Sequence, residues 1–322
     1  MRRHIAQNPE PDNIRHTMKS ECHIAAFYRF VDLGTTDKLA RHLADLCAQL
    51  EIKGTIILAP EGVNGTVAGT SAALGQLHDR LLAELGCDAL EWKLSVATQP
   101  PFGKLKIKQK AEIISLGIDG IRPQDKTGKH VGPEQWNALL RDPRTLVIDT
   151  RNSYEVALGS FPGAVDPATR TFRQFPDFVE QNLDEDKSRP VAMFCTGGIR
   201  CEKAAALVMD QGFGEVYQLN GGILRYLEDV APAENLWEGE CFVFDERLSV
   251  DANLAPGGHE PCGNCHLPVL PEEKALPGYE PGISCPKCEA SLTPSRRRAL
   301  QEKLKQLQLA EQRAGRSGAT HG

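Results

Sequence analysis

Apolar positions in the first third of the chain recur with two different periods. Leu39, Leu43 and Leu46 repeat at about the 3.6-residue period of an amphipathic helix, which Thr36 can cap. Short apolar runs between turn residues instead predict strands. The expected elements are strands over 22–31, 53–59, 62–68 and 90–96, a helix over 36–50, and a helix to residue 85 that Ser71 can cap. Their order, β-α-β-β-α-β, is typical of a ferredoxin-like sandwich.

Lysines take every second position in the stretch that follows, 104–110, with the apolar residues Leu105 and Ile107 between the first three. On a strand, four lysines about 7 Å apart would share one face, with the apolar residues on the other. Such a row can contact the phosphate backbone of a nucleic acid, or it can protect an edge strand from aggregation. We favour RNA binding, because edge protection rarely needs four lysines in succession. The four are Lys104, Lys106, Lys108 and Lys110.

The central part, 139–233, alternates short apolar runs with helical segments, which predicts a parallel sheet covered by helices on both faces. One run, 191–194, leads into Cys195, and a helix follows after a loop that contains Gly197 and Gly198. The glycines let backbone N–H groups turn toward the sulfur, and the start of the helix adds partial positive charge. Both effects favour a thiolate, so we interpret Cys195 as a nucleophile rather than a buried structural cysteine.

The Cys-x-x-Gly-x-Arg pattern of residues 195–200 resembles the active-site loop of rhodanese domains, which carry sulfur as a cysteine persulfide. The stretch 146–151, with its Asp-x-Arg end, is similar to the entry strand of that family, and Ser160 stands where the family usually has His. From Cys195 to Arg200 the loop has six residues, as in sulfurtransferases, whereas the related phosphatases use one more. The loop length therefore argues against a phosphatase.

Several residues around this loop receive expected roles. The guanidinium of Arg200 can fix the loop and pair with an anionic sulfur or a substrate phosphate, so we expect Arg200 to be catalytic together with Cys195. Asp149 and Arg151 come at a strand end, where an ion pair would support the neighbouring loop. Cys201 can form a disulfide with Cys195 or relay sulfur, or it is a small residue buried on the inner face of the helix; the sequence leaves these alternatives open.

Two Cys-x-x-Cys pairs, separated by 19 residues, lie in the third part of the chain, 234–294. Large apolar residues are few in this segment and Pro and Gly are frequent, so it lacks a core of its own. The spacing fits a tetrahedral structural zinc site, which would supply folding energy. The alternative is a set of reduced or redox-active cysteines. The expected ligands are Cys262, Cys265, Cys285 and Cys288.

Charge is segregated along the chain. The net charge is −6, but residues 1–20 carry +2 and residues 295–322 carry +5, which leaves −13 for the rest. Isoelectric point alone therefore does not indicate nucleic-acid binding, and local patches matter more. No run of about 18 apolar residues predicts a membrane span, and residues 1–20 lack the apolar core of a secretory signal. The ten cysteines are not spaced as a disulfide framework, so we expect a cytoplasmic protein.

Residues 21–295 as a whole resemble the rhodanese-containing tRNA uridine hydroxylases. The stretch 59–66, Ala-Pro-Glu-Gly-Val-Asn-Gly-Thr, is similar to their N-terminal signature, and 195–204 is similar to their active-site signature at every position. The resemblance implies a ferredoxin-like (acylphosphatase-like) α+β domain, a rhodanese-like parallel α/β domain and a Cys-rich piece. It also implies oxygen-dependent conversion of the wobble uridine of tRNA to 5-hydroxyuridine, with Cys195 essential and molecular oxygen as co-substrate. No flavin, haem or non-haem iron motif identifies the electron donor.

Two other functions stay open at this point. One is a plain sulfurtransferase, which would act through a Cys195 persulfide and would not require tRNA. The other is a non-enzymatic RNA-binding or redox-sensing protein, in which Cys195 would only sense oxidation. The expected division of the chain is a flexible tail over 1–20, the ferredoxin-like domain over 21–117, a linker over 118–138, the rhodanese-like domain over 139–233, the Cys-rich segment over 234–294, and a basic helical or disordered tail over 295–322.

Overall fold

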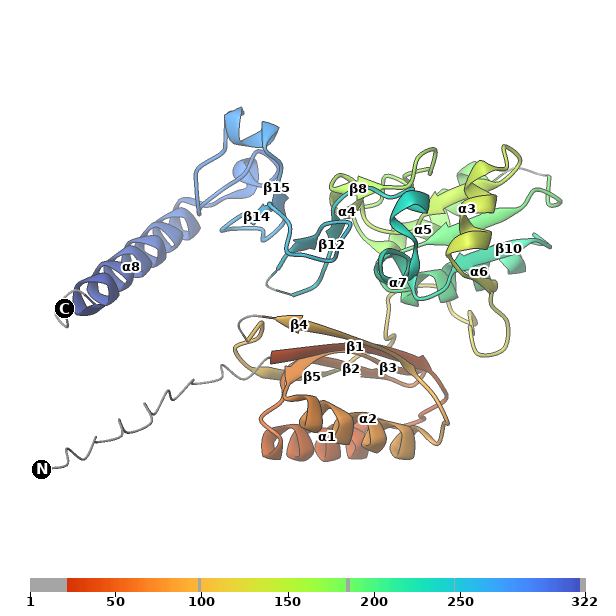
Figure 1. Ribbon diagram of the computed structural model, residues 1–322, viewed down its shortest axis with the longest axis horizontal. Helices are drawn as coiled ribbons and strands as arrows, with labels where there is room; N and C mark the ends of the chain where they lie inside the picture. Colours follow the sequence, from red (N-terminus) through yellow and green to blue (C-terminus); the bar gives the residue numbers. More distant parts are fainter. Residues whose placement is uncertain (1–21, 98–99, 184–185, 246, 319–322) are drawn as a thin grey trace, which may run out of the picture.

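Three parts follow one another along the chain in the computed structural model, which describes residues 22–97, 100–183, 186–245 and 247–318 (Figure 1). The N-terminal α+β domain has both helices on one face of its sheet, and the central domain and the Cys-rich segment lie beyond the other face (Figure 1). The tail expected over 1–20 lies outside the described residues.

The N-terminal domain is a five-stranded sheet with the order β4-β1-β3-β2-β5. β1 to β4 pair antiparallel, and β5 joins the edge in parallel with β2. The expected β-α-β-β-α-β order is confirmed. The strands are β1 (Cys22–Phe30), β2 (Lys53–Ala59), β3 (Gly62–Gly69), β4 (Glu91–Ala97) and β5 (Leu105–Gln109), and the helices are α1 (Asp37–Gln49) and α2 (Ser71–Leu85).

The apolar core of this domain lies between the sheet and its two helices. Leu105 and Ile107 of β5 pack against it. Because side chains alternate along a strand, Lys106 and Lys108 project from the opposite face of the sheet. The buried core residues of the helices include Leu39, Leu43, Leu74, Leu77 and Leu81.

The starts of the two helices differ from the sequence prediction. Thr36 precedes α1, but its hydroxyl donates to the side chain of Gln109 instead of capping the helix. The cap of α2 is Thr70, whose hydroxyl accepts the N–H of Ala73, and Ser71 is the first helical residue. Thr and Ser both cap well, so neighbouring residues of these types leave the boundary uncertain by one position.

The central domain has a four-stranded parallel sheet with the order β6-β10-β9-β7. Every residue of β9 is buried, as expected for a strand covered on both faces. Its strands are β6 (Lys129–Val131), β7 (Leu146–Asp149), β9 (Val191–Phe194) and β10 (Val216–Leu219), with β8 (Gly159–Ser160) outside this sheet. Its helices are α3 (Pro133–Arg141), α4 (Ser153–Val156), α5 (Phe175–Asn182), α6 (Ile199–Asp210) and α7 (Gly222–Asp229), with a 3-10 turn η1 (Phe172–Gln174).

The segment expected as a linker, 118–138, contributes to the central domain. β6 pairs in parallel with β10, with Tyr217 opposite Lys129. α3 begins at Pro133, and its Trp136 is fully buried. The domain therefore begins near Lys129 rather than at residue 139. A three-residue strand that buries a single side chain gives no periodic signal in the sequence.

Short elements make up the Cys-rich segment. β11 (Glu238–Gly239) pairs with β8 and so ties the segment to the central domain. Val269 and three cysteines, Cys262, Cys285 and Cys288, form a buried cluster with Cys265 partly buried beside it, whereas Trp237, Val243 and Val250 pack into the core of the central domain. The remaining elements are the ladders of β12 (Cys241–Phe242) with β13 (Ser249–Val250) and of β14 (Glu260–Pro261) with β15 (Pro268–Val269), and the 3-10 turns η2 (Pro232–Glu234), η3 (Glu272–Ala275) and η4 (Glu289–Ser291).

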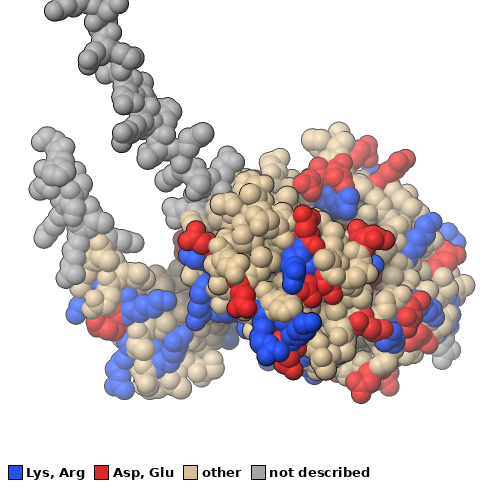
Figure 2. Space-filling view, turned by 90° about the horizontal axis from the view of Figure 1, so that it is seen from below, with Lys and Arg blue, Asp and Glu red and all other residues tan. Residues whose placement is uncertain are grey.

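A long helix, α8 (Pro294–Gly318), follows the Cys-rich segment, so the tail expected as helical or disordered is helical as far as it is described. Lys and Arg side chains gather on this protruding helix, whereas charges of both signs are mixed over the body (Figure 2). Within the described part of the chain, no helix is both long and apolar enough to cross a bilayer. The basic residues of α8 include Arg296, Arg297, Arg298, Lys303 and Lys305.

Candidate active site

The loop between β9 and α6 curls around the sulfur of Cys195. The side chain is buried, and the backbone N–H of Gly198 donates to Sγ over 3.1 Å. Gly198 has a φ of 100°, a conformation that favours glycine, and the chain turns there into α6. Gly222 of α7 packs on the loop so closely that a Cβ would collide with the carbonyl oxygen of Cys195. Gly197, by contrast, faces open space in the cavity.

The surroundings of Cys195 stabilise its thiolate. Burial by itself would raise the pKa of this thiol, but a hydrogen bond from Cys201, the charge of Arg200 and two backbone N–H groups lower the pKa to about 5. Burial and the neighbouring Cys195 raise the pKa of Cys201 well above its usual value. Near neutral pH, Cys195 is therefore a thiolate and Cys201 a thiol.

Cys201 lies beneath the loop as a free, buried thiol. Its Sγ lies 3.6 Å from the hydroxyl of Thr150, and it also donates to Cys195. The geometry fits a supporting donor for the Cys195 thiolate, and a relay of sulfur between the two cysteines stays a hypothesis.

Arg200 is paired with Glu155 of α4, a carboxylate for which the sequence predicted no role. Its Nη1 and Nη2 lie 2.6 and 2.7 Å from the two carboxylate oxygens, and the side chains are 5% and 0% exposed. We expected the guanidinium to pair with an anionic sulfur or a phosphate. Instead its fork is bound to Glu155, because a buried charge needs a partner, and Arg200 acts on Cys195 through its charge and its backbone N–H.

Removing the charge of Arg200 and removing the charge of Glu155 should shift the pKa of Cys195 in opposite directions. Arg200→Met removes a positive charge near the sulfur and should raise the pKa above about 5, whereas Glu155→Gln leaves that charge unneutralised and should lower it. Each change leaves one buried charge without its partner, so each should lower the free energy of unfolding by about 3–5 kcal/mol. The measurements are the rate of Cys195 alkylation by iodoacetamide as a function of pH, and denaturant unfolding.

A surface pair provides the control for these two variants. Arg141 and Glu234 form an ion pair at 3.3 Å, and their side chains are 59% and 60% exposed. Arg141→Met should change the free energy of unfolding by less than about 1 kcal/mol and leave the alkylation profile unaltered. Equal pKa values of Cys195 in Arg200→Met and Glu155→Gln would contradict the charge argument.

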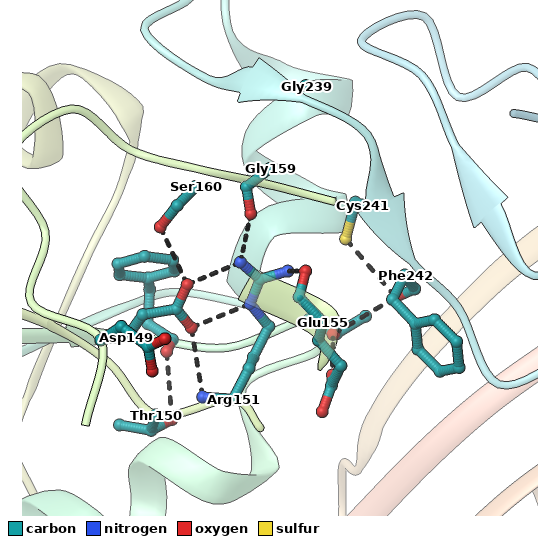
Figure 3. Close-up of polar contacts among 12 residues, drawn as sticks. Asp149, Thr150, Arg151, Glu155, Gly159, Ser160, Gly239, Cys241 and Phe242 are labelled. Carbon is teal, nitrogen blue, oxygen red and sulfur yellow. Dashed lines mark hydrogen bonds and ion pairs between the residues drawn. The ribbon is translucent and has the colours of Figure 1, made fainter. Parts of the chain in front are cut away.

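Asp149 and Arg151 form a second buried ion pair (Figure 3). Nε and Nη2 of Arg151 lie 2.8 and 2.6 Å from the carboxylate oxygens of Asp149, and both side chains are fully buried. Arg151 also donates to the carbonyl of Gly159, and the hydroxyl of Ser160 donates to Asp149 over 2.9 Å (Figure 3). Neither member of the pair lines the cavity in front of Cys195, which suits a structural rather than a chemical role.

A cavity of about 890 Å³ opens in front of Cys195. The rhodanese-like loop supplies one wall, with Cys195 and Gly197, and the helix-free face of the N-terminal sheet supplies another. The Cys-rich segment closes a third side with Phe244 and Arg247. All three parts of the chain therefore contribute to the space in which Cys195 can react.

The lysine row lies on the sheet face that forms the cavity wall. Lys106 and Lys108 are in register with Thr55 and Ile57 of β2, and both of these β2 residues line the cavity. Paired residues on neighbouring strands point to the same face, and Lys110 itself lines the cavity. β5 is also an edge strand, and edge protection is the alternative role of the row. All four lysines, Lys104, Lys106, Lys108 and Lys110, are exposed.

Two motif segments meet where the domains join. Lys203 of α6 is 2% exposed, and its Nζ lies 2.8 Å from Glu61 and 2.7 Å from Glu112. Glu61 belongs to the segment 59–66 and Lys203 to the segment 195–204. The two segments that carry the sequence resemblance thus join the N-terminal domain to the helix that starts at the active-site loop.

Four cysteines of the Cys-rich segment converge on one point. Their sulfur atoms all lie within 4.8 Å of one another, with pairs at 3.6, 3.7 and 3.8 Å. Four sulfurs at about 2.3 Å from a tetrahedrally coordinated ion lie about 3.8 Å apart, so this set can hold a metal ion. None of the four lines the Cys195 cavity. The set is Cys262, Cys265, Cys285 and Cys288.

Comparison with known proteins agrees with this division of the chain. The UPF0176 acylphosphatase-like domain matches residues 22–113, and the rhodanese-like domain matches residues 132–229. The tRNA uridine(34) hydroxylase of Teredinibacter turnerae is 50% identical over 290 residues, which are 90% of this chain and 90% of that protein. This chain belongs to the tRNA uridine(34) hydroxylase family.

The solved structures that are similar to this hydroxylase family member match about a third of its chain. The rhodanese-like domain of an Anabaena sp. protein is 21% identical with a TM-score of 0.29, and the match covers 34% of this chain and 78% of that one. The human single-domain sulfurtransferase TSTD1 is 20% identical with a TM-score of 0.27, over 32% and 99% of the two chains. Scores this low add nothing to the fold described above.

Three residues that shape the site of this hydroxylase family member were not predicted to do so. Glu155 lies three residues after Asn152, in a capping-box pattern at the start of α4, and this pattern marks it as an acceptor for the backbone N–H of Asn152. Lys203 follows the active-site loop within the signature, but its partners are distant in sequence. Lys93 of β4 lines the cavity, and no local pattern distinguishes it from other strand lysines.

Proposed function

We propose that this protein hydroxylates uridine 34 of tRNA, the reaction that the name of its Teredinibacter relative states for that protein. The observation that carries the proposal is the 50% identity over 90% of both chains. The geometry supports it, because a thiolate faces a cavity built by all three parts of the chain. Cys195 is the essential nucleophile of this proposal, Arg200 tunes its charge, and Cys201 donates to it. Asp149, Arg151, Gly197 and Gly198 support the loop.

The proposed substrate is tRNA, not DNA, in the cytoplasm. Ligand cavities span roughly 300–1,000 Å³, so the cavity of about 890 Å³ has room for an extruded nucleotide. Molecular oxygen is the proposed co-substrate, and its reduction needs an electron donor. The proposed metal is zinc, held by the four cysteines that can bind an ion, with a structural role.

Nucleoside mass spectrometry of tRNA from a strain that lacks the gene tests the proposal. Loss of 5-hydroxyuridine, restored by the wild-type gene in the presence of oxygen, is the expected result. Loss of a thiolated nucleoside would instead indicate a sulfurtransferase. An unchanged nucleoside profile would favour an RNA-binding or redox-sensing protein without this activity.

Replacing all four lysines of the row with Gln should weaken binding to every tRNA alike. The row borders the cavity wall, so it lies where the backbone of a bound tRNA would pass. Each phosphate contact that is lost should reduce the slope of log affinity against log salt by roughly 0.7–0.9. Filter binding or fluorescence anisotropy over a salt series measures both effects.

The control variant replaces two basic residues on the opposite face of the same domain. Lys38 and Arg41 are exposed on α1, which covers the face of the sheet away from the cavity. Their replacement with Gln should leave affinity and salt slope close to wild type. An unchanged slope of log affinity against log salt in the quadruple lysine variant would indicate that the row protects the edge strand from aggregation and does not bind tRNA.

A further inference from the structure

Lys93 enters the cavity from a different domain than Cys195. It lies on β4 opposite Ala26 of β1, and both residues belong to the cavity wall formed by the N-terminal sheet. Its amine reaches the turn before α7, because a Cβ placed on Gly221 would lie 3.0 Å from Nζ. The next residue, Gly222, begins α7 and packs on the backbone of Cys195. The amine of Lys93 is therefore close to the active-site loop.

The amine of Lys93 is buried, yet it has no hydrogen-bond partner among the described residues. Burial lowers the pKa of Lys93 to about 8, although the negative charge of Cys195 partly opposes this shift. Glu91 and Glu228 also line the cavity, but neither forms an ion pair with the amine. A buried, unsatisfied donor costs free energy in the empty protein, and a ligand acceptor would remove that cost.

We propose that Lys93 reads the target base: its ammonium donates a hydrogen bond to the 4-carbonyl oxygen of the uracil in the cavity, and this contact selects uridine over cytidine. The inference rests on the proposed function. It goes beyond that function by assigning base selection to a residue of the N-terminal domain.

The chemistry of the two pyrimidines explains the selection. An ammonium group offers donors and no acceptor. Uracil presents a carbonyl oxygen at position 4, which accepts, whereas cytosine presents an amino group there, which donates. Cytosine would therefore leave two donors facing each other in a buried site, and such a mismatch strongly rejects the wrong ligand. Apolar neighbours such as Ile24 and Val96 also line the cavity, which suits a flat ring better than a phosphate.

Phe244 offers the base a surface on which to stack. Its side chain lines the cavity but is 58% exposed, and the guanidinium of Arg200 lies 5.9 Å from its ring centroid. Stacking on an aromatic ring is tolerant of base identity. Phe244 would therefore hold either pyrimidine, and Lys93 would supply the choice between them.

Binding of two anticodon stem-loops tests this division of roles. The fluorescein-labelled RNAs differ only in carrying U or C at position 34, and anisotropy gives the dissociation constants. Wild type should prefer the U loop by roughly tenfold or more, the effect of one well-placed hydrogen-bond pattern. Lys93→Met should reduce this ratio to about one, mainly by weakening binding of the U loop. Phe244→Ala should weaken both loops by a similar factor and keep the ratio.

Three results would overturn the assignment of Lys93. One is a Lys93→Met protein that binds both loops as the wild type does, and another is equal weakening of both loops in that variant, which would place the ammonium on a phosphate. A wild-type protein that binds the U and C loops equally would also overturn it. The nucleoside analysis tests uridine hydroxylation separately. Met replaces an unpaired buried charge with an apolar chain of similar length, so the fold should be kept, and thermal unfolding verifies this. Lys93→Arg, which retains donors, should keep part of the preference.

Discussion

Cys195→Ser is expected to abolish 5-hydroxyuridine formation in tRNA while leaving the fold unchanged. The loop lowers the pKa of the Cys195 thiol to about 5, but a Ser hydroxyl titrates so far above a thiol that it stays neutral in the same place. The N–H of Gly198 can donate to either atom, so the loop should keep its conformation. Nucleoside mass spectrometry of tRNA from a deletion strain expressing the variant measures the activity, and thermal unfolding of the purified protein measures the fold. Normal 5-hydroxyuridine would contradict the assignment of Cys195 as the nucleophile.

Cys201→Ser is the matched control, since it makes the same chemical change six positions later. The Ser hydroxyl can still donate to Cys195 and still contact Thr150, so the variant should retain substantial activity if Cys201 is only a supporting donor. A disulfide or a sulfur relay needs the second sulfur itself. Complete loss of 5-hydroxyuridine in Cys201→Ser would therefore favour one of those roles.

The fold was predictable where the hydrophobic period is strong. The strand expected over 53–59 is observed as β2 with the same ends, and its apolar run stops at the turn that begins with Pro60. β6 was not predictable, because two of its three side chains are exposed and its place depends on backbone pairing with β10. Pairing between segments far apart in sequence leaves no local pattern.

The active site shows the same contrast between local and distant interactions. The thiolate environment comes from adjacent residues of one loop, so the spacing of Cys195, Gly197 and Gly198 was sufficient to predict it. The ion pair of Arg200 with Glu155 joins positions 45 residues apart, and Lys203 meets Glu112 across 91 residues. With 43 Asp and Glu residues in the chain, sequence alone could not select these partners. The nucleophile was therefore identifiable, and its electrostatic support required the structure.

Removal of metal from the four-cysteine set is expected to unfold residues 251–294 of the Cys-rich segment and leave the two larger domains folded. The buried cluster around the set consists of Val269 and three of the cysteines, with Cys265 only partly buried, so apolar burial contributes little to the stability of this stretch. Structural zinc sites supply roughly 10–16 kcal/mol of apparent binding free energy in small domains, enough to decide whether the segment folds. Elemental analysis should give about one zinc per chain. Chelation should increase proteolysis within 251–294 and weaken tRNA binding, while Cys195 stays reactive toward iodoacetamide.

The pH dependence and a distant cysteine provide two checks on the zinc prediction. Zinc binds thiolates, so protons compete with it, and metal should be released as the pH falls. Cys87 lies outside the set in the N-terminal domain, so Cys87→Ser should leave the zinc content unchanged, whereas Cys285→Ser should reduce it. Far less than one metal per chain, with all four cysteines of the set alkylated in the folded protein, would exclude the site. The cysteine pairs would then become candidates for the electron path that oxygen-dependent hydroxylation requires.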